Sequence, residues 1–198
     1  WVQTYDPSAA AQVLPGSGVV WSLSVEEQFY IGFALLWIFL VRLRRGREVL
    51  LAFAIAAIVF STTLRFFIPD DMDILIVRST GTRLDSIAWG VLAAVLFSFW
   101  AQGRFGRLQI LGRDWALPLA ITLFLSSVVI PDRLTFTVQS IASVIIVLWG
   151  LLPGDTLVRR TVFAVSNWLP ITVIGLASYS IYLAHGPIIY WILPMLNV

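Results

Sequence analysis

Six long apolar stretches divide this chain, and they constrain its fold more than any other feature of the sequence. Each is about as long as the roughly 20 residues that an α-helix needs to cross a bilayer. Only 12% of the 198 residues are charged, whereas an ordinary soluble domain has about 25%. The sequence therefore predicts an all-α, polytopic integral membrane helix bundle with about six transmembrane helices, at residues 23–41, 49–68, 84–101, 115–131, 135–152 and 171–196.

Arginine is concentrated in alternate connections between these predicted spans. The first, third and fifth connections carry it, and the second is acidic. The positive-inside rule then predicts that the arginine-rich connections lie in the cytoplasm. Residues 1–22, an extramembrane loop, and the acidic loop at 69–82 would lie outside. Residues 157–170 have the pattern of an amphipathic segment at the membrane interface.

The composition excludes several kinds of chemistry. The chain has no cysteine, no lysine and one histidine. Disulfides, thiolate metal sites, an acyl-cysteine intermediate, a lysine Schiff base and a multi-histidine metal site are therefore excluded, and we expect no metal. The net charge of +2 is spread along the chain, which argues against a nucleic-acid partner. The chain begins at Trp1 in a polar stretch without a signal peptide, so we expect it to be the C-terminal part of something longer.

Two adjacent carboxylates occur in "WSLSVEEQFY", residues 21–30, at the edge of the first predicted span. On a helix, Glu26 shares a face with Ser22 and Tyr30, and Glu27 points about a quarter turn away. One interpretation is that both carboxylates mark the membrane edge, where a helix N-terminus favours negative charge. The alternative is that Glu26 faces a polar cavity with Tyr30 and binds or activates a substrate.

Two further stretches carry polar groups into apolar spans. In "RLDSIAWG", Arg83 and Asp85 are two residues apart and face nearly opposite ways on a helix, so each needs its own partner, cavity or ligand. An ion pair between Arg83 and Glu26 is one possibility. In "SYSIYLAHGP", Tyr182 and His185 share a face, and Pro187 leaves a backbone carbonyl unpaired. His185 is either a neutral packing residue or a catalyst.

Together, these three stretches resemble those of one family, the membrane-bound acyltransferase-3 proteins. "WSLSVEEQFY" is close to the family's most recognisable string, and "RLDSIAWG" and "SYSIYLAHGP" are similar to two of its other elements, in the same order. The resemblance implies transfer of an acyl group, in the first instance acetyl, from acyl-CoA to a hydroxyl of a carbohydrate or glycoconjugate. It implies no bound cofactor, a membrane-lipid environment, and the inner membrane of a bacterium.

The resemblance also implies a set of site residues. The expected catalytic residues are Glu26, Arg83 and His185, and the expected substrate-binding residues are Trp21, Tyr30, Asp85 and Tyr182. The chain departs from the family at Val19 and Ala184, where histidine and tryptophan are frequent. The family's proposed catalytic histidine belongs to an earlier span with no counterpart here, so this chain alone would hold only a partial site and be inactive.

Two other classes of function fit the same polar groups. A membrane transport or lipid-binding protein would use them as a pathway or binding site without chemistry. A non-catalytic fragment would use them only to hold a structural or partner-binding bundle together.

Overall fold

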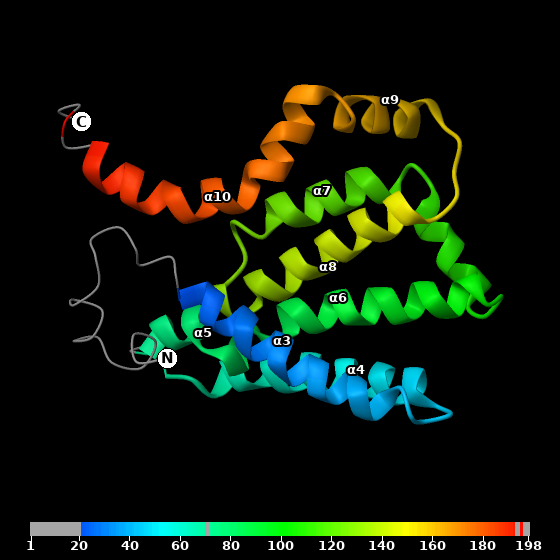
Figure 1. Ribbon diagram of the computed structural model, residues 1–198, viewed down its shortest axis with the longest axis horizontal. Coiled ribbons are helices and arrows are strands. Elements are labelled where there is room, and N and C mark those ends of the chain that lie inside the picture. Colours follow the sequence, from blue (N-terminus) through cyan, green and yellow to red (C-terminus); the bar gives the residue numbers. More distant parts are fainter. Residues whose placement is uncertain (1–20, 70–71, 193–194, 196–198) are drawn as a thin grey trace. The chain divides into compact units, whose positions relative to one another are not determined.

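The computed structural model describes residues 21–69, 72–192 and 195, and within these ranges the regular structure is helical (Figure 1). The side chains of residues 21, 24 and 73–75 are outside this description. Most of the predicted N-terminal loop and the end of the last predicted span also lie outside the described residues. The helices are α3 (Trp21–Leu40), α4 (Gly46–Phe67), α5 (Asp73–Arg78), α6 (Thr80–Ala101), the 3₁₀ segment η3 (Gly106–Gly112), α7 (Ala116–Ser126), α8 (Asp132–Leu151), α9 (Leu157–Ser166) and α10 (Leu169–Ile192).

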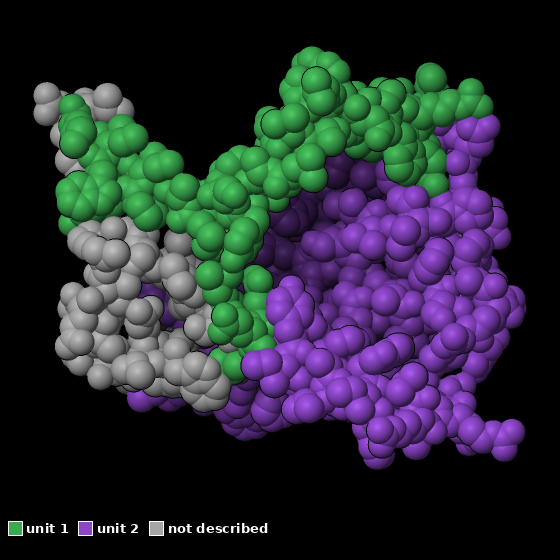
Figure 2. Space-filling model, in the orientation of Figure 1, with its two compact units in different colours: residues 1–28, 157–198 green, residues 29–156 purple. Residues whose placement is uncertain are grey.

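The chain divides into two compact units, coloured separately in Figure 2. We call residues 29–156 the central unit, and residues 1–28 with 157–198 the terminal unit. The predicted site residues are divided between them. Tyr30, Arg83 and Asp85 belong to the central unit, and the other predicted site residues belong to the terminal unit.

In the central unit, α4 packs along α6, and α6 also packs against α8. The buried positions of α4 recur every three or four residues and are mostly small: Leu50, Ala54, Ala57, Ser61 and Arg65. Such a stripe lets two helix backbones approach closely, as is usual for helices packed in a membrane. One apolar cluster joins Leu40, Leu50, Val95 and Phe99, and a second joins Ala93, Leu148 and Leu152.

Four helices of the described chain are long and apolar enough to cross a membrane: α4, α6, α8 and α10. Each covers one of the predicted spans with ends shifted by a few residues, and α3 covers the first predicted span. The all-helical membrane fold is therefore confirmed. By length and composition, the count is four, or five if a bent pair forms one span, so the prediction of six is approximate.

The span predicted at 115–131 corresponds to α7, which ends at Ser126 and forms the bent pair with η3 before it. Helix α7 has only 11 residues and rises about 16 Å, roughly half of a hydrocarbon core of about 30 Å. It meets η3 at a bend of 73°. Polar groups hold this bend, because Thr156 Oγ1 donates a 2.7 Å hydrogen bond to Asp114 in the turn between them.

The terminal unit contains α9 and α10. Helix α9 lies within the segment predicted to be amphipathic, and its Arg159 is buried although most of its residues are exposed. Helix α10 continues through Pro187 and has no buried residue among those described. Figure 1 shows that α10 changes direction part-way along its length. A proline inside a helix removes one backbone hydrogen bond and is an ordinary cause of such bending.

Candidate active site

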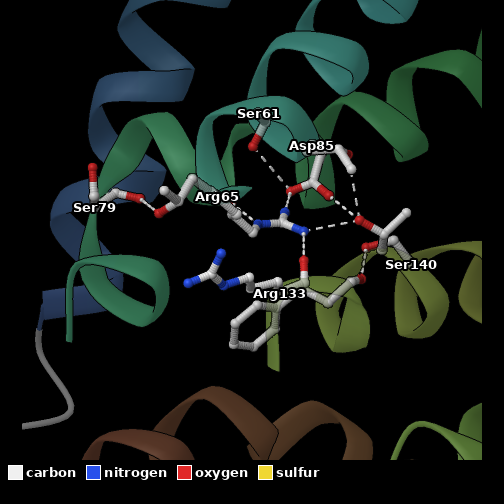
Figure 3. A network of polar contacts seen from close by, with 10 residues as sticks. Ser61, Arg65, Ser79, Asp85, Arg133 and Ser140 are labelled. Atoms are coloured by element: carbon white, nitrogen blue, oxygen red, sulfur yellow. Dashed lines mark hydrogen bonds and ion pairs between the residues drawn. The ribbon is translucent and has the colours of Figure 1, made fainter. Parts of the chain in front are cut away.

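A buried ion pair between Arg65 of α4 and Asp85 of α6 lies at the centre of a polar network (Figure 3). Neither side chain has any exposed surface. One carboxylate oxygen of Asp85 accepts hydrogen bonds from Arg65 and, at 3.2 Å, from Ser61. The other accepts a 2.9 Å hydrogen bond from Thr137 of α8. Both carboxylate oxygens are therefore satisfied within the protein.

The guanidinium of Arg65 is equally well satisfied. Its Nε donates to the carbonyl of Thr82 at 2.8 Å, and its Nη1 donates to the carbonyl of Arg133 at 3.0 Å and to the hydroxyl of Thr137 at 2.9 Å. A buried charge is tolerated only when such partners replace water. Because these partners come from three helices, the network ties α4, α6 and α8 together at one end of the central unit.

Helix periodicity explains how the sequence builds this network. Ser61 and Arg65 are four residues apart on α4, and Arg133 and Thr137 are four apart on α8, so each pair shares one helix face. Asp85 stands one turn into α6 and meets both faces. A single alignment of α4, α6 and α8 therefore forms the polar network. The same alignment forms the apolar clusters farther along these helices.

Arg83 takes no part in the hydrogen bonds of Asp85 described above, but its guanidinium lies against Phe136, a ring that the Arg65 guanidinium also approaches, at 5.8 Å. Its guanidinium carbon lies 3.9 Å from the centre of the Phe136 ring, which is a cation–π distance. Arg83 also lines a cavity of about 420 Å³ beside α6 and α8, with Ser86, Gln139 and Ser140. Arg83 therefore presents a positive charge to a space that could hold a ligand.

In the terminal unit, Tyr182 connects two helices. Its hydroxyl is hydrogen-bonded to the hydroxyl of Ser22 at the start of α3. The Nδ1 atom of His185 is 2.5 Å from the carbonyl oxygen of Tyr182, and the two rings lie 5.5 Å apart. Since a carbonyl oxygen only accepts, Nδ1 is the donor in this hydrogen bond. Nε2 is thus the ring nitrogen that this hydrogen bond does not use.

The remaining predicted site residues are mostly exposed. Glu26 and Glu27 are both exposed in the first half of α3, and Tyr30 is 63% exposed in the central unit. The side chain of Trp21 lies outside the described residues. An Arg83–Glu26 ion pair would join the two units and stays a prediction. No group of three or more metal-ligating residues occurs in the part of the chain that was described.

Comparison with known proteins identifies the family. A family model described as an acyltransferase domain matches residues 2–198, which is nearly the whole chain. The chain belongs to the acyltransferase-3 family. Within this acyltransferase-3 chain, all three strings singled out from the sequence fall in the matched region.

Curated relatives of this acyltransferase-3 chain include the O-acetyltransferase OatA of Staphylococcus aureus. The OatA of strain NCTC 8325 / PS 47 is 25% identical over 188 residues, covering 87% of this chain and 29% of the relative. The OatA proteins of strains COL and MRSA252 match to the same extent. The chain thus spans less than a third of the length of these relatives. No solved structure matches the chain.

The sequence interpretation of this acyltransferase-3 chain missed Arg65 and Thr137. Arg65 stood at the end of a predicted span and resembled an ordinary interfacial arginine. Asp85 could nevertheless have pointed to Arg65, because a carboxylate inside an apolar helix needs a cationic partner at the same depth in the membrane. Arg65 lies near the end of α4 and Asp85 near the start of α6, so two antiparallel helices joined by a short connection bring them level.

Proposed function

We propose that this chain acts in a membrane O-acyltransferase that moves an acyl group, in the first instance acetyl, from acyl-CoA to a hydroxyl of a carbohydrate or glycoconjugate. The observation that carries the proposal is the acyltransferase-domain match over residues 2–198. The name of the relatives, O-acetyltransferase, supports acetyl as the group and oxygen as the acceptor atom. That the chain is one portion of a longer acyltransferase remains a prediction from the sequence.

The reaction needs a base and a positive group. The acceptor oxygen attacks the thioester carbon, a C–O bond forms, the C–S bond breaks, and the hydroxyl proton passes through the base to the leaving sulfur. His185 is our proposed base, supported by the hydrogen bond that engages Nδ1 and leaves Nε2 for proton transfer. Arg83 is our proposed stabiliser of the developing oxyanion, supported by its place beside a cavity.

The other predicted residues take supporting roles in this proposal. Glu26 is exposed and would orient the acceptor hydroxyl or the base, and Tyr30, Trp21 and Tyr182 would contact the acceptor. Asp85 is better suited to positioning than to direct substrate contact, because its carboxylate is buried and held by Arg65 and Thr137. Asp85 would then act by keeping α6, and with it Arg83, in register.

We further propose that the protein lies in the cytoplasmic membrane of a bacterium, with its arginine-rich connections inside. The apolar helices and the bacterial source of the relatives support this location. Such a topology gives the arginine-rich side access to cytoplasmic acyl-CoA.

The function is tested with membranes that contain the longer acyltransferase of which this chain is predicted to be the C-terminal part, because the chain alone is predicted to be inactive. The membranes receive acetyl-CoA labelled in its acetyl group and a panel of glycans. We expect label to appear in an ester on a glycan. Within that assay, Glu26→Gln and Glu27→Gln form a matched pair, because both carboxylates are exposed in α3. We expect Glu26→Gln to lower the rate at least 100-fold and Glu27→Gln to change it less than twofold. Solute uptake into vesicles without any ester product would instead support a transporter.

A further inference from the structure

Two arginine side chains from different helices approach a single aromatic ring, that of Phe136 on α8. The guanidinium carbon of Arg83, on α6, is 3.9 Å from the ring centre, and that of Arg65, on α4, is 5.8 Å from it. Both distances fall within the roughly 6 Å over which the face of a ring attracts a cation. All three residues belong to the central unit, so this arrangement is a property of that unit alone.

The buried network fixes the backbone that carries the Phe136 ring. The guanidinium of Arg65 donates to the carbonyl of Arg133, three residues before Phe136, at 3.0 Å (Figure 3). It also donates to the hydroxyl of Thr137, the next residue, at 2.9 Å, and this hydroxyl donates to Asp85. Moving this turn of α8 would break hydrogen bonds of a buried ion pair, which is costly. The ring is therefore attached to a turn that the ion pair holds in place.

A ring in a fixed place can orient the side chain of Arg83. An arginine side chain has many rotamers, and selecting one of them costs conformational entropy. A group that stabilises an oxyanion is most effective when it is oriented before the charge develops. Contact with a ring face acts through the charge and the plane of the guanidinium and need not use its N–H groups as donors. Phe136 can therefore orient Arg83 whatever hydrogen bonds the guanidinium also makes.

We propose that Phe136 is a positioning residue for acyl transfer, whose ring holds the Arg83 guanidinium in the orientation that the oxyanion requires. The inference rests on the proposed function, in which Arg83 stabilises that oxyanion. Arg65 and Asp85 act one step farther away, because they hold the turn of α8 that carries the ring. Asp85 also neutralises Arg65, so the ring does not have two uncompensated cations against it.

The contact is tested first without acyl transfer, by NMR of the chain in micelles with isotope-labelled arginine. The resonance of the Arg83 Nε–H group, identified by its loss in Arg83→Gln, should be shifted upfield by the ring. Phe136→Leu removes the ring and keeps an apolar side chain, so the resonance should move toward that of the exposed Arg42. Phe60→Leu is the matched control, because Phe60 is 56% exposed on α4, and it should leave the resonance in place. An Arg83 resonance that stays in place in Phe136→Leu would overturn the proposal.

The second test uses the longer acyltransferase that is predicted to contain this chain, with phenylalanines that carry one, two or three ring fluorines at position 136. Fluorine withdraws electron density from the ring face and changes the size of the ring little, so it weakens the attraction for a cation without removing the packing. We expect kcat to fall stepwise, by about tenfold with three fluorines. The KM for acetyl-CoA and the free energy of unfolding should stay unchanged.

The same fluorinated rings should have no effect on kcat in an Arg83→Gln background, because the cation that they act on is gone. A kcat that does not depend on the number of fluorines in the unaltered background would overturn the proposal, since a ring that only fills space would behave in this way. Absence of acyl transfer by the unaltered protein would count against the proposed function instead. The NMR comparison would then still decide whether Phe136 orients Arg83.

Discussion

Asp85 and Arg65 form an ion pair in which both side chains are fully buried, and groups of three helices, α4, α6 and α8, are bonded to it. Removing one partner leaves an uncompensated charge in the bundle, which typically costs about 3–5 kcal/mol. We therefore expect Asp85→Ala to lower the free energy of unfolding by about that amount. Denaturant unfolding in detergent micelles, followed by circular dichroism, measures this difference.

Two controls accompany the Asp85 measurement. Glu48→Gln breaks the exposed Arg104–Glu48 pair and should leave the unfolding midpoint unchanged, because solvent screens that pair. The double variant Arg65→Met with Asp85→Leu should be more stable than Asp85→Ala, since no buried charge remains. An Asp85→Ala protein as stable as the unaltered one would show that the pair does not hold the helices.

Thr137 provides a finer test of the same network. Its hydroxyl donates to Asp85 and accepts from Arg65, so Thr137→Val leaves two charged groups each short of one partner. We expect a loss of about 1–3 kcal/mol in the free energy of unfolding. Thr122→Val is the matched control, because the Thr122 hydroxyl is exposed and bonds only the carbonyl one turn back. Equal stability of the two variants would contradict this account of the network.

The turn between α3 and α4 depends on Gly46. A Cβ atom at this position would collide with the carbonyl oxygen of Leu40, which is backbone and cannot rotate away. We expect Gly46→Ala to cost about 1–3 kcal/mol, as overpacking usually does. Gly32→Ala should instead stabilise α3, because its Cβ meets nothing within 4 Å and alanine favours a helix. Thermal unfolding that ranked the two variants in the opposite order would contradict this reading of the turn.

Much of the fold could be predicted from the sequence because each apolar run is a local property. The runs predicted at 49–68 and 84–101 became α4 and α6 with ends moved by a few residues. The opposed directions of Arg83 and Asp85 also follow from helix geometry alone. The partner of Asp85 could not be predicted in the same way. Identifying Arg65 as that partner requires the relative register of two helices, which helix geometry alone does not give. The predicted span at 115–131 began close to the start of α7, but it overran the end of that helix at Ser126, because the residues that follow are also apolar.

The predicted membrane orientation can be tested by cysteine labelling, because the chain has no cysteine of its own. Met72 lies before α5 in the acidic connection, and Arg107 lies in an arginine-rich one. In intact cells, an impermeant maleimide should label Met72→Cys. It should label Arg107→Cys only after the membrane is opened. Labelling of Arg107→Cys in intact cells would reverse the orientation that the positive-inside rule predicts.

Tyr182 is expected to hold the start of α3 through its hydrogen bond with Ser22. Tyr182→Phe removes this bond and keeps the ring beside His185. Amide hydrogen exchange should then become faster in the first two turns of α3, where exchange reports local opening. Tyr179→Phe serves as the control, because Tyr179 is 58% exposed on the same helix. Unchanged exchange in the Tyr182→Phe protein would mean that the bond does not restrain α3.

The most direct test of the proposed acyl transfer is the rate of glycan acetylation in native membranes by the longer acyltransferase that contains this chain, with Arg83→Gln. Arg83 lines the cavity and lies outside the Arg65–Asp85 pair, so its loss should affect chemistry more than folding. We expect the rate to fall at least 100-fold, which is the usual cost of removing a group that stabilises an oxyanion. The free energy of unfolding of the Arg83→Gln protein and its amount in the membrane should match those of an Arg42→Gln control. A folded Arg83→Gln protein that acetylates glycans at the unaltered rate would contradict the account.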